Sequence, residues 1–198
     1  MSLHVLSDLS GNAGCNVEMD IGLDDAWESI PRCFLASSQD TLQSLSLESE
    51  NLIIGYFRPG IDSDSLAELH FPRLKNLMLG RMAFDDEDKG RPVQKFIVSH
   101  KQNLERLVLK RCSMVCLSCN TAPEARWKDT FTRWAKELCC LREVEVFDHD
   151  YQLWEGEYDF CFEDPEWADL EDGEIAAFLA EDAAALQMLK NATKQRKS

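Results

Sequence analysis

The stretch that decides the fold is residues 96–112, which read FIVSHKQNLERLVLKRC. Leu107 and Leu109 are two positions apart, so in a β-strand their side chains fall on the same face. Leu104 comes three residues before Leu107, where the chain would turn inward as it enters that strand. The apolar pair Phe96–Ile97 precedes Leu104, with a polar stretch in between. An apolar anchor, a polar stretch and L-x-x-L-x-L predict a helix, a turn and a strand.

The same spacing occurs four times along the chain. The four segments are Leu42-x-x-Leu45-x-Leu47, Leu74-x-x-Leu77-x-Leu79, Leu104-x-x-Leu107-x-Leu109 and Leu141-x-x-Val144-x-Val146. Their first residues are 32, 30 and 37 positions apart. An apolar anchor precedes each segment by seven or eight residues: Phe34–Leu35, Leu66, Phe96–Ile97 and Trp134. Such units cannot bury their apolar faces alone, so their stacking predicts an α/β fold with a parallel sheet backed by helices.

This pattern resembles the leucine-rich-repeat family. In the third unit, Leu104, Leu107, Leu109 and Cys112 occupy the L-x-x-L-x-L-x-x-C/N frame of that family. The other units carry Glu50, Met82 and His149 at the position of Cys112. Long, irregular repeats of this kind are most similar to the C-terminal recognition domains of fungal F-box proteins. The resemblance covers about residues 30–150 and implies a short, irregular solenoid of about four repeats with capping ends.

The length predicts one domain over residues 1–198. We divide it into an N-terminal cap or partial repeat (1–32), the repeats (33–150), an acidic capping segment with a C-terminal helix (151–192) and a basic tail (193–198). For residues 1–32 two interpretations remain: a helical cap or partial repeat, or a disordered start. Leu3, Leu6 and Leu9 have the spacing of a helix rather than of a strand. Ile175, Phe178, Leu179, Leu186 and Leu189 form the apolar stripe that predicts a helix over 173–192.

A second predicted helix covers residues 121–134, in the last repeat. Trp127, Phe131, Trp134 and Leu138 are spaced by four, three and four residues. This spacing places the four side chains along one face of a helix, and we expect that face to pack in the core.

The acidity of the chain is concentrated in one segment. The net charge is -15, from 21 basic and 36 acidic residues. Residues Asp148 to Asp182 hold 14 acidic residues and no Lys or Arg. This balance argues against nucleic acid or an anionic membrane as a partner, because both are bound through clustered Lys and Arg. The same segment contains Tyr158, Phe160 and Phe162, whose alternation predicts an edge strand. It either caps the repeats or binds a basic partner.

The eight cysteines are the only cluster that resembles a metal site. Cys116 and Cys119 have C-x-x-C spacing, and Cys139 follows after 19 intervening residues, near the spacing of a four-cysteine zinc site. The second half of that motif is missing, because Cys140 is adjacent to Cys139. We therefore expect buried or loop thiols, no metal and no cofactor. Without a recognisable signal peptide, reduced thiols predict a cytoplasmic or nuclear protein.

No residue pattern in the chain predicts catalysis. Asp148-His149-Asp150 contains the elements of an oriented base, but no nucleophile motif accompanies it, so we expect a turn there. The remaining basic cluster, Lys101, Arg106, Lys110 and Arg111, is either a solvated surface or a contact for an acidic partner.

We therefore expect a module that binds other proteins and is not an enzyme. The strands would present alternate side chains on an exposed face, such as Gln43, Ser44 and Ser46, or Glu105, Arg106 and Val108.

The resemblance implies the substrate-recognition part of an F-box-like protein, which recruits substrates for ubiquitination. The F-box that docks a Skp-type adaptor is not recognisable in this sequence, so adaptor binding is expected only if an F-box lies upstream. The alternatives are an acidic interaction scaffold or mimic, and a zinc-binding protein or enzyme built on the cysteines or His149.

Overall fold

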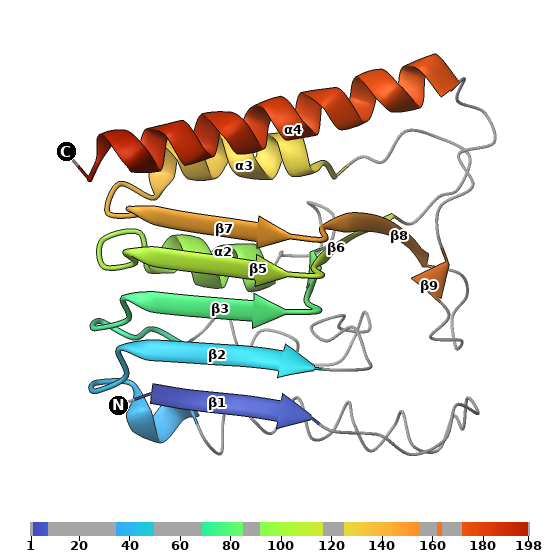
Figure 1. Cartoon of the computed structure of the whole chain (residues 1–198). Coiled ribbons are helices and arrows are strands. Elements are labelled where there is room, and N and C mark those ends of the chain that lie inside the picture. The colour runs from blue at the N-terminus through green and yellow to red at the C-terminus, as the bar shows by residue number, and fades with distance from the viewer. Residues whose placement is uncertain are drawn as a thin grey trace, which may run out of the picture.

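A computed structural model describes residues 2–7, 35–49, 69–84, 92–116, 125–154, 162–163 and 172–197. Its main element is a five-stranded sheet in the order β1-β2-β3-β5-β7 (Figure 1). The strands are β1 (Ser2–Ser7), β2 (Ser44–Ser49), β3 (Asn76–Gly80), β5 (Arg106–Lys110) and β7 (Glu143–Phe147). All neighbouring strands are parallel. The predicted α/β fold with a parallel sheet is confirmed.

The register of the sheet reproduces the spacing of the sequence repeats. Leu77 pairs with Leu45 on one side and with Leu107 on the other, and Leu107 pairs with Val144. The first leucine of every unit is fully buried: Leu42, Leu74, Leu104 and Leu141. The L-x-x-L-x-L segments are therefore four equivalent strand entries, each of which buries the same positions in one core.

The residue before each strand joins one unit to the next by a repeated pair of backbone hydrogen bonds. The Gln43 carbonyl accepts the N–H groups of Lys75 and Asn76 at 2.9 and 3.1 Å. The carbonyls of Lys75 and Glu105 accept the corresponding pairs of N–H groups from the units that follow them. The units are thus held in register before the strand ladder begins.

Each of the last three units continues into a second, smaller sheet, which the sequence did not predict. Its strands are β4 (Ala83–Phe84), β6 (Ser113–Cys116), β8 (Asp150–Trp154) and β9 (Phe162–Glu163), in that order. β4, β6 and β8 are parallel, whereas β9 is antiparallel to β8. β9 agrees with the predicted edge strand at Phe162, while Tyr158 and Phe160 lie outside the described residues.

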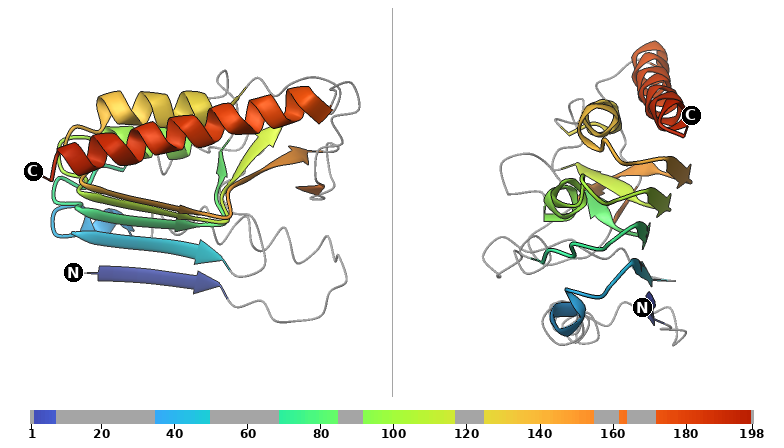
Figure 2. Two further views of the ribbon diagram at one scale, coloured as in Figure 1. Left: turned by 45° about the horizontal axis from the view of Figure 1, so that its top comes forward. Right: turned by 90° about the vertical axis from the view of Figure 1, so that its left-hand side faces the viewer.

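A residue with left-handed backbone conformation makes the bend between the two sheets. Arg81, Arg111 and Asp148 have φ angles of 53°, 50° and 49°, and each directly follows a strand of the main sheet. The N–H of Arg111 donates to the Phe147 carbonyl at 2.9 Å. Residues with a side chain adopt this conformation at a cost of about 1 kcal/mol. The packing of both sheets therefore imposes the bend, which Figure 2 shows.

The helices lie behind the main sheet and bury the predicted anchors (Figure 2). They are the 3-10 turn η2 (Ala36–Ser38), α2 (Pro92–Ser99) and α3 (Trp127–Glu137). Leu35, Phe96, Ile97 and Trp134 are fully buried, as predicted. Leu66 lies outside the described residues. The predicted stripe of α3 is also confirmed, because Trp127, Phe131 and Leu138 are fully buried beside Trp134.

The C-terminal helix α4 (Asp172–Gln195) differs from the prediction in two respects. Leu179 is 48% exposed, because the face that packs against the protein contains Phe178, Asp182, Ala185, Leu186 and Leu189. The helix also continues past residue 192, and Thr193 is buried. Arg196 then donates to the carbonyls of Ala135, Leu138 and Leu141. The expected basic tail is therefore mostly docked.

Ser2–Ser7, the described part of the N-terminal segment, forms a strand and not a helix. It pairs in parallel with Ser44–Ser49, so β1 adds a strand to the edge of the sheet. The helical spacing of Leu3 and Leu6 was misleading because the unpaired edge of β2 offers a row of backbone partners that local spacing does not reveal. Leu9 lies outside the described residues.

A buried histidine connects two units of the fold. The Phe71 N–H donates to Nε2 of His100 at 2.9 Å, and Nδ1 of His100 lies 2.7 Å from the Phe96 carbonyl. An acceptor at Nε2 and a donor at Nδ1 define the neutral ring. Burial lowers the pKa of His100 to about 4. Both ring nitrogens of the neutral form therefore make hydrogen bonds. They fix Phe71, at the start of the second unit, to the C-terminal end of α2.

We expect Arg111→Val to lower the free energy of unfolding by about 1 kcal/mol, because a β-branched residue tolerates the left-handed conformation poorly. Arg142→Val is the matched control: it is also an exposed arginine in a turn, but its φ is not positive. Urea unfolding of both variants measures the difference. Equal stability of the two variants would contradict the assigned role of the bend.

We expect the protein to lose stability as the pH falls from 6.5 to about 4, because the unfolded chain binds a proton at His100 that the folded chain excludes. Because the pKa of His100 is lower in the folded chain, the free energy of unfolding is highest above pH 6.5. It falls by about 3 kcal/mol in total as the pH drops to about 4. His100→Gln should flatten the dependence of unfolding free energy on pH. An unchanged slope in His100→Gln would refute the prediction.

Candidate functional site

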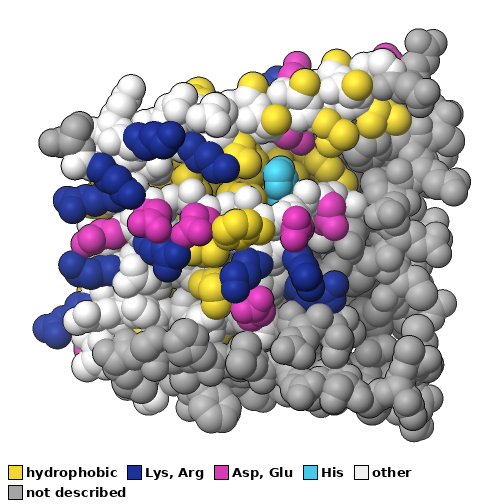
Figure 3. Space-filling model, viewed as in Figure 1, with side chains coloured by type: hydrophobic (Ala, Val, Ile, Leu, Met, Phe, Trp, Pro, Cys, Tyr) yellow, Lys and Arg dark blue, Asp and Glu magenta, His cyan; other side chains and the backbone are white. Residues whose placement is uncertain are grey.

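One face of the main sheet is not covered by any described helix, and we call it the open face. α2 and α3 cover the opposite face, and α4 lies along the β7 edge (Figure 2). The open face consists of three rows that cross the strands: Ser44, Asn76, Arg106 and Glu143; Ser46, Met78, Val108 and Glu145; Glu48, Gly80, Lys110 and Phe147. Figure 3 shows apolar side chains at its centre with charged side chains around them.

The charged side chains of the open face are paired with one another. Arg106 donates to Glu143 at 2.9 Å and to Glu145 at 2.6 Å. These hydrogen bonds lower the pKa of Glu143. Lys110 lies 3.6 Å from Glu48, which is two strands away. The pair can cross the intervening strand only because Gly80 lies between its members: a Cβ at Gly80 would be 2.5 Å from Cγ of Glu48.

The centre of the open face is apolar and partly exposed. Met78 is half-buried, and Phe147 is 46% exposed. Val108 and Ser46 were predicted to be exposed, but both are only 4% exposed. The prediction was wrong for these middle-row residues because Val108 is flanked in register by the larger Met78 and Glu145.

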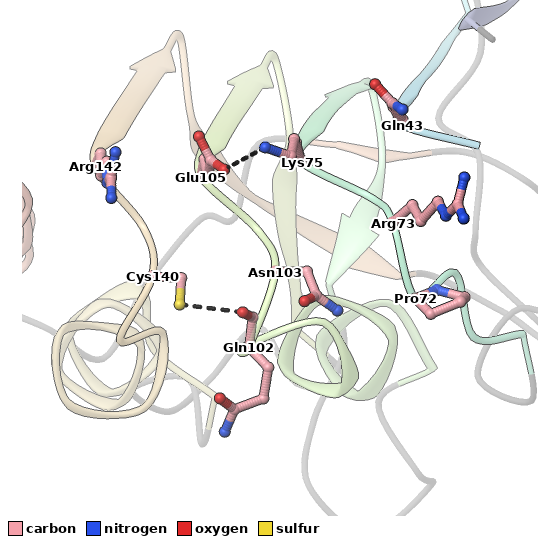
Figure 4. Close-up of a pocket in the computed structure, with 9 residues that line it drawn as sticks. All are labelled: Gln43, Pro72, Arg73, Lys75, Gln102, Asn103, Glu105, Cys140 and Arg142. Atoms are coloured by element: carbon pink, nitrogen blue, oxygen red, sulfur yellow. Dashed lines mark hydrogen bonds and ion pairs between the residues drawn. The ribbon is translucent and has the colours of Figure 1, made fainter. Parts of the chain in front are cut away.

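A second feature is a hollow of about 450 Å³ at the edge where the strands begin, which we call the entry groove (Figure 4). It is lined by Gln43, Pro72, Arg73, Lys75, Gln102, Asn103, Glu105, Cys140 and Arg142. These residues come from the successive turns that precede β2, β3, β5 and β7. Sequence reasoning missed the groove, because its lining residues are up to 99 positions apart and belong to no common motif.

The entry groove carries positive charge on an acidic protein. Three of its lining residues are basic and one is acidic. Lys75 pairs with Glu105 at 2.9 Å, and this contact lowers the pKa of Glu105. The side chains of Arg73 and Arg142 make no hydrogen bond or ion pair with the described part of the chain. Two guanidinium groups are therefore available to a ligand.

Of the three zinc candidates, the structure describes the side chain of Cys139 alone. Cys139 is exposed in the turn after α3, while Cys119 and the side chain of Cys116 lie outside the described residues. Among the residues that are described, no three His, Cys, Asp or Glu side chains gather as metal ligands. The Cys140 thiol donates to the Gln102 carbonyl at 3.1 Å, and burial together with Cys139 raises the pKa of Cys140.

Cys112, in contrast, has a structural role. Its side chain is fully buried, and the thiol donates to the Leu79 carbonyl of the preceding unit at 3.5 Å. Burial raises its pKa to about 12, so the thiol stays protonated. This contact fits the frame position that the sequence assigned to Cys112.

His149 lies in the predicted turn, between β7 and β8. Its ring packs edge-on against Trp127 and Phe131, with centroid distances of 5.6 and 5.8 Å. Burial lowers its pKa. The imidazole therefore packs against the aromatic residues of α3.

A buried polar network joins α4 to the start of α3. Asp182 is 3% exposed and accepts hydrogen bonds from the hydroxyl of Tyr151, the N–H of Lys128 at 2.9 Å and the guanidinium of Arg126 at 3.4 Å. The Tyr151 hydroxyl accepts the N–H of Trp127. Burial and the contact with Asp182 raise the pKa of Tyr151 well above its usual value. Residues distant in sequence thus cap a helix whose N-cap residue provides no side-chain cap.

Comparison with known proteins does not identify the chain: no family model, no curated protein and no solved structure matches it. The described helices include none with the length and apolar character needed to cross a membrane. The open face and the entry groove are therefore the two surfaces from which a function can be inferred.

We expect Asp182→Ala to lower the free energy of unfolding by about 2–4 kcal/mol, because it leaves the N–H of Lys128 and the buried hydroxyl of Tyr151 without their acceptor. Glu181→Ala is the matched control, because the neighbouring Glu181 pairs with Arg126 and Lys128 at the surface. Its loss should be much smaller. Chemical unfolding monitored by tryptophan fluorescence compares the two, and similar losses would contradict the role of Asp182 as a buried cap.

Proposed function

We propose that this chain is a protein-binding module and that its open face holds the partner. One observation carries the proposal: helices cover one face of the parallel sheet, while the other face presents ordered rows of side chains that no described element covers. The equal register of successive units, with offsets that match the sequence repeat, supports a leucine-rich-repeat-like solenoid as the scaffold.

The chemistry of the open face suits a partner that supplies apolar side chains. Its ion pairs, Arg106 with Glu143 and Glu145, and Lys110 with Glu48, already neutralise one another. A partner therefore gains little from opposite charge there. Protein interfaces commonly combine an apolar centre with a polar rim, and an exposed aromatic residue contributes strongly when it becomes fully buried. Met78 and Val108 in the middle row provide such a centre, and the exposed Phe147 lies on β7 opposite Lys110, one row from Val108.

The finer proposal is the substrate-recognition part of an F-box-like protein, with the adaptor-binding module supplied elsewhere or lost. It is supported by the resemblance of the repeat pattern to fungal F-box recognition domains. The acidic scaffold or mimic is less well supported, because the described residues Tyr151, Phe178 and Asp182 of the acidic segment are buried against α3 and one another. Their burial favours capping.

We expect the combined substitutions Met78→Ser and Phe147→Ser to remove the partners of the open face. The matched control is Leu179→Ser with Met188→Ser, which removes two apolar side chains that are 48% and 43% exposed on the outer face of α4. Proximity labelling of tagged full-length chains in the native cells measures partner recovery, with circular dichroism to verify folding. We expect at least a tenfold loss, roughly 1.4 kcal/mol of binding free energy, for the open-face variant only.

The outcome that contradicts the proposal is recovery of the same partners, in the same amounts, by both variants. The F-box proposal is tested separately with a purified Skp-type adaptor. This chain should not bind the adaptor, and a longer product that includes the upstream sequence should bind it. If the longer product also fails to bind, the F-box assignment is wrong while the protein-binding module stands.

A further inference from the structure

We propose that the entry groove is a second binding site, which holds an extended acidic segment of a protein partner. The groove crosses the turns of successive units. Figure 4 shows Arg142 at one end and Arg73 at the other, with the Glu105–Lys75 pair between them and Gln102 and Asn103 below that pair. A chain that lies along the groove meets a cation at each end and carboxamides beside the neutralised pair in the middle. This site is independent of the open face, because none of its lining residues belongs to the three rows defined above.

The charge arrangement of the groove selects for anions. Glu105 forms an ion pair with Lys75 at 2.9 Å, so the one acidic residue that lines the groove is already neutralised. Arg73 and Arg142 make no hydrogen bond or ion pair with the described side chains, although the charge of Arg142 helps to lower the pKa of Glu105. A guanidinium group binds a carboxylate through two parallel hydrogen bonds, which makes it the better cation for an acidic side chain. The groove therefore offers two carboxylate sites on a chain whose net charge is -15.

These arginines do not have the position that helix stabilisation would require. Basic residues that complement a helix dipole lie in its last turn. α3 ends at Glu137, five residues before Arg142, and Arg73 follows no described helix. Both lie instead at strand entries and line the same hollow.

The geometry favours a peptide over other anions. The two arginines lie at opposite ends of the groove, an arrangement that suits an extended ligand (Figure 4). A nucleic acid strand would require more cations and aromatic rings for stacking, and none of the nine lining residues is aromatic. Carboxamides such as Gln102 and Asn103 provide donors and acceptors for a peptide backbone.

The test uses the full chain and fluorescently labelled peptides of about eight residues, long enough to cross four strands spaced about 4.8 Å apart. One peptide alternates Glu and Gly, and the other carries Gln at each Glu position. We expect the Glu peptide alone to bind in a fluorescence anisotropy titration. The double variant Arg73→Gln with Arg142→Gln should weaken binding about tenfold.

The matched control is Lys95→Gln with Lys136→Gln, which removes the same charge from exposed positions on α2 and α3. It should change affinity by less than about twofold, because exposed charges distant from the groove are screened by salt. Equal weakening by both double variants would overturn the proposal, since it would show only an effect of net charge. Equal binding of the Gln peptide, or no binding of the Glu peptide, would also overturn it.

Two further measurements distinguish a peptide site from a nucleic acid site and from the open face. A single-stranded oligonucleotide that binds more tightly than the Glu peptide, with the same dependence on Arg73 and Arg142, would assign the groove to nucleic acid and refute the peptide proposal. Met78→Ser with Phe147→Ser should leave peptide binding unchanged. Loss of native partners in that variant with retained peptide binding supports both sites, whereas retained partners with retained peptide binding would refute the open face alone.

Discussion

The burial of one leucine at the entry of each strand is the constraint on which the rest of the structure depends. Leu42, Leu74, Leu104 and Leu141 are fully buried and equivalent in the register of the sheet. Because these side chains must stack, each unit has to start at the same level as its neighbour, whatever the length of its connection. The remaining surfaces follow from this alignment. Alternate strand residues are directed to the open face, and the residues of the turns collect at one edge, where they form the entry groove.

A sheet that grows by parallel addition needs a feature that ends it, and α4 supplies that feature at β7. An exposed edge strand presents unpaired backbone groups to other chains. The helix is fixed near its middle by Asp182, which caps α3. Just after its C-terminal end, Arg196 donates to carbonyls at the end of α3 and in the turn after it. At least one acidic residue of the segment 148–182, Asp182, therefore stabilises the fold.

The sequence predicted the features that follow from side-chain periodicity. The strand entries, the α3 stripe of Trp127 and Phe131 and the turn at Asp148 are where the spacing placed them. The second sheet was missed because its strands are as short as two residues, and because Arg81 and Arg111 adopt a conformation that normally signals glycine. The open face was predicted, but the burial of Val108 depends on neighbours from other strands. The entry groove could not be predicted, since contacts between turns bring its residues together.

The two surfaces differ in whether their charged side chains are already paired, and this difference predicts different modes of binding. On the open face Arg106 is already engaged by Glu143 and Glu145, so binding there would come from apolar burial and would change little with salt. In the entry groove Arg73 and Arg142 make no hydrogen bond or ion pair with the described side chains, so binding there would come from charge and would weaken with salt. A partner that carries an acidic segment beside an apolar surface would engage both at once. The first contact would then raise the effective concentration of the second, which gives a modest apolar patch and an exposed groove an affinity that neither provides alone.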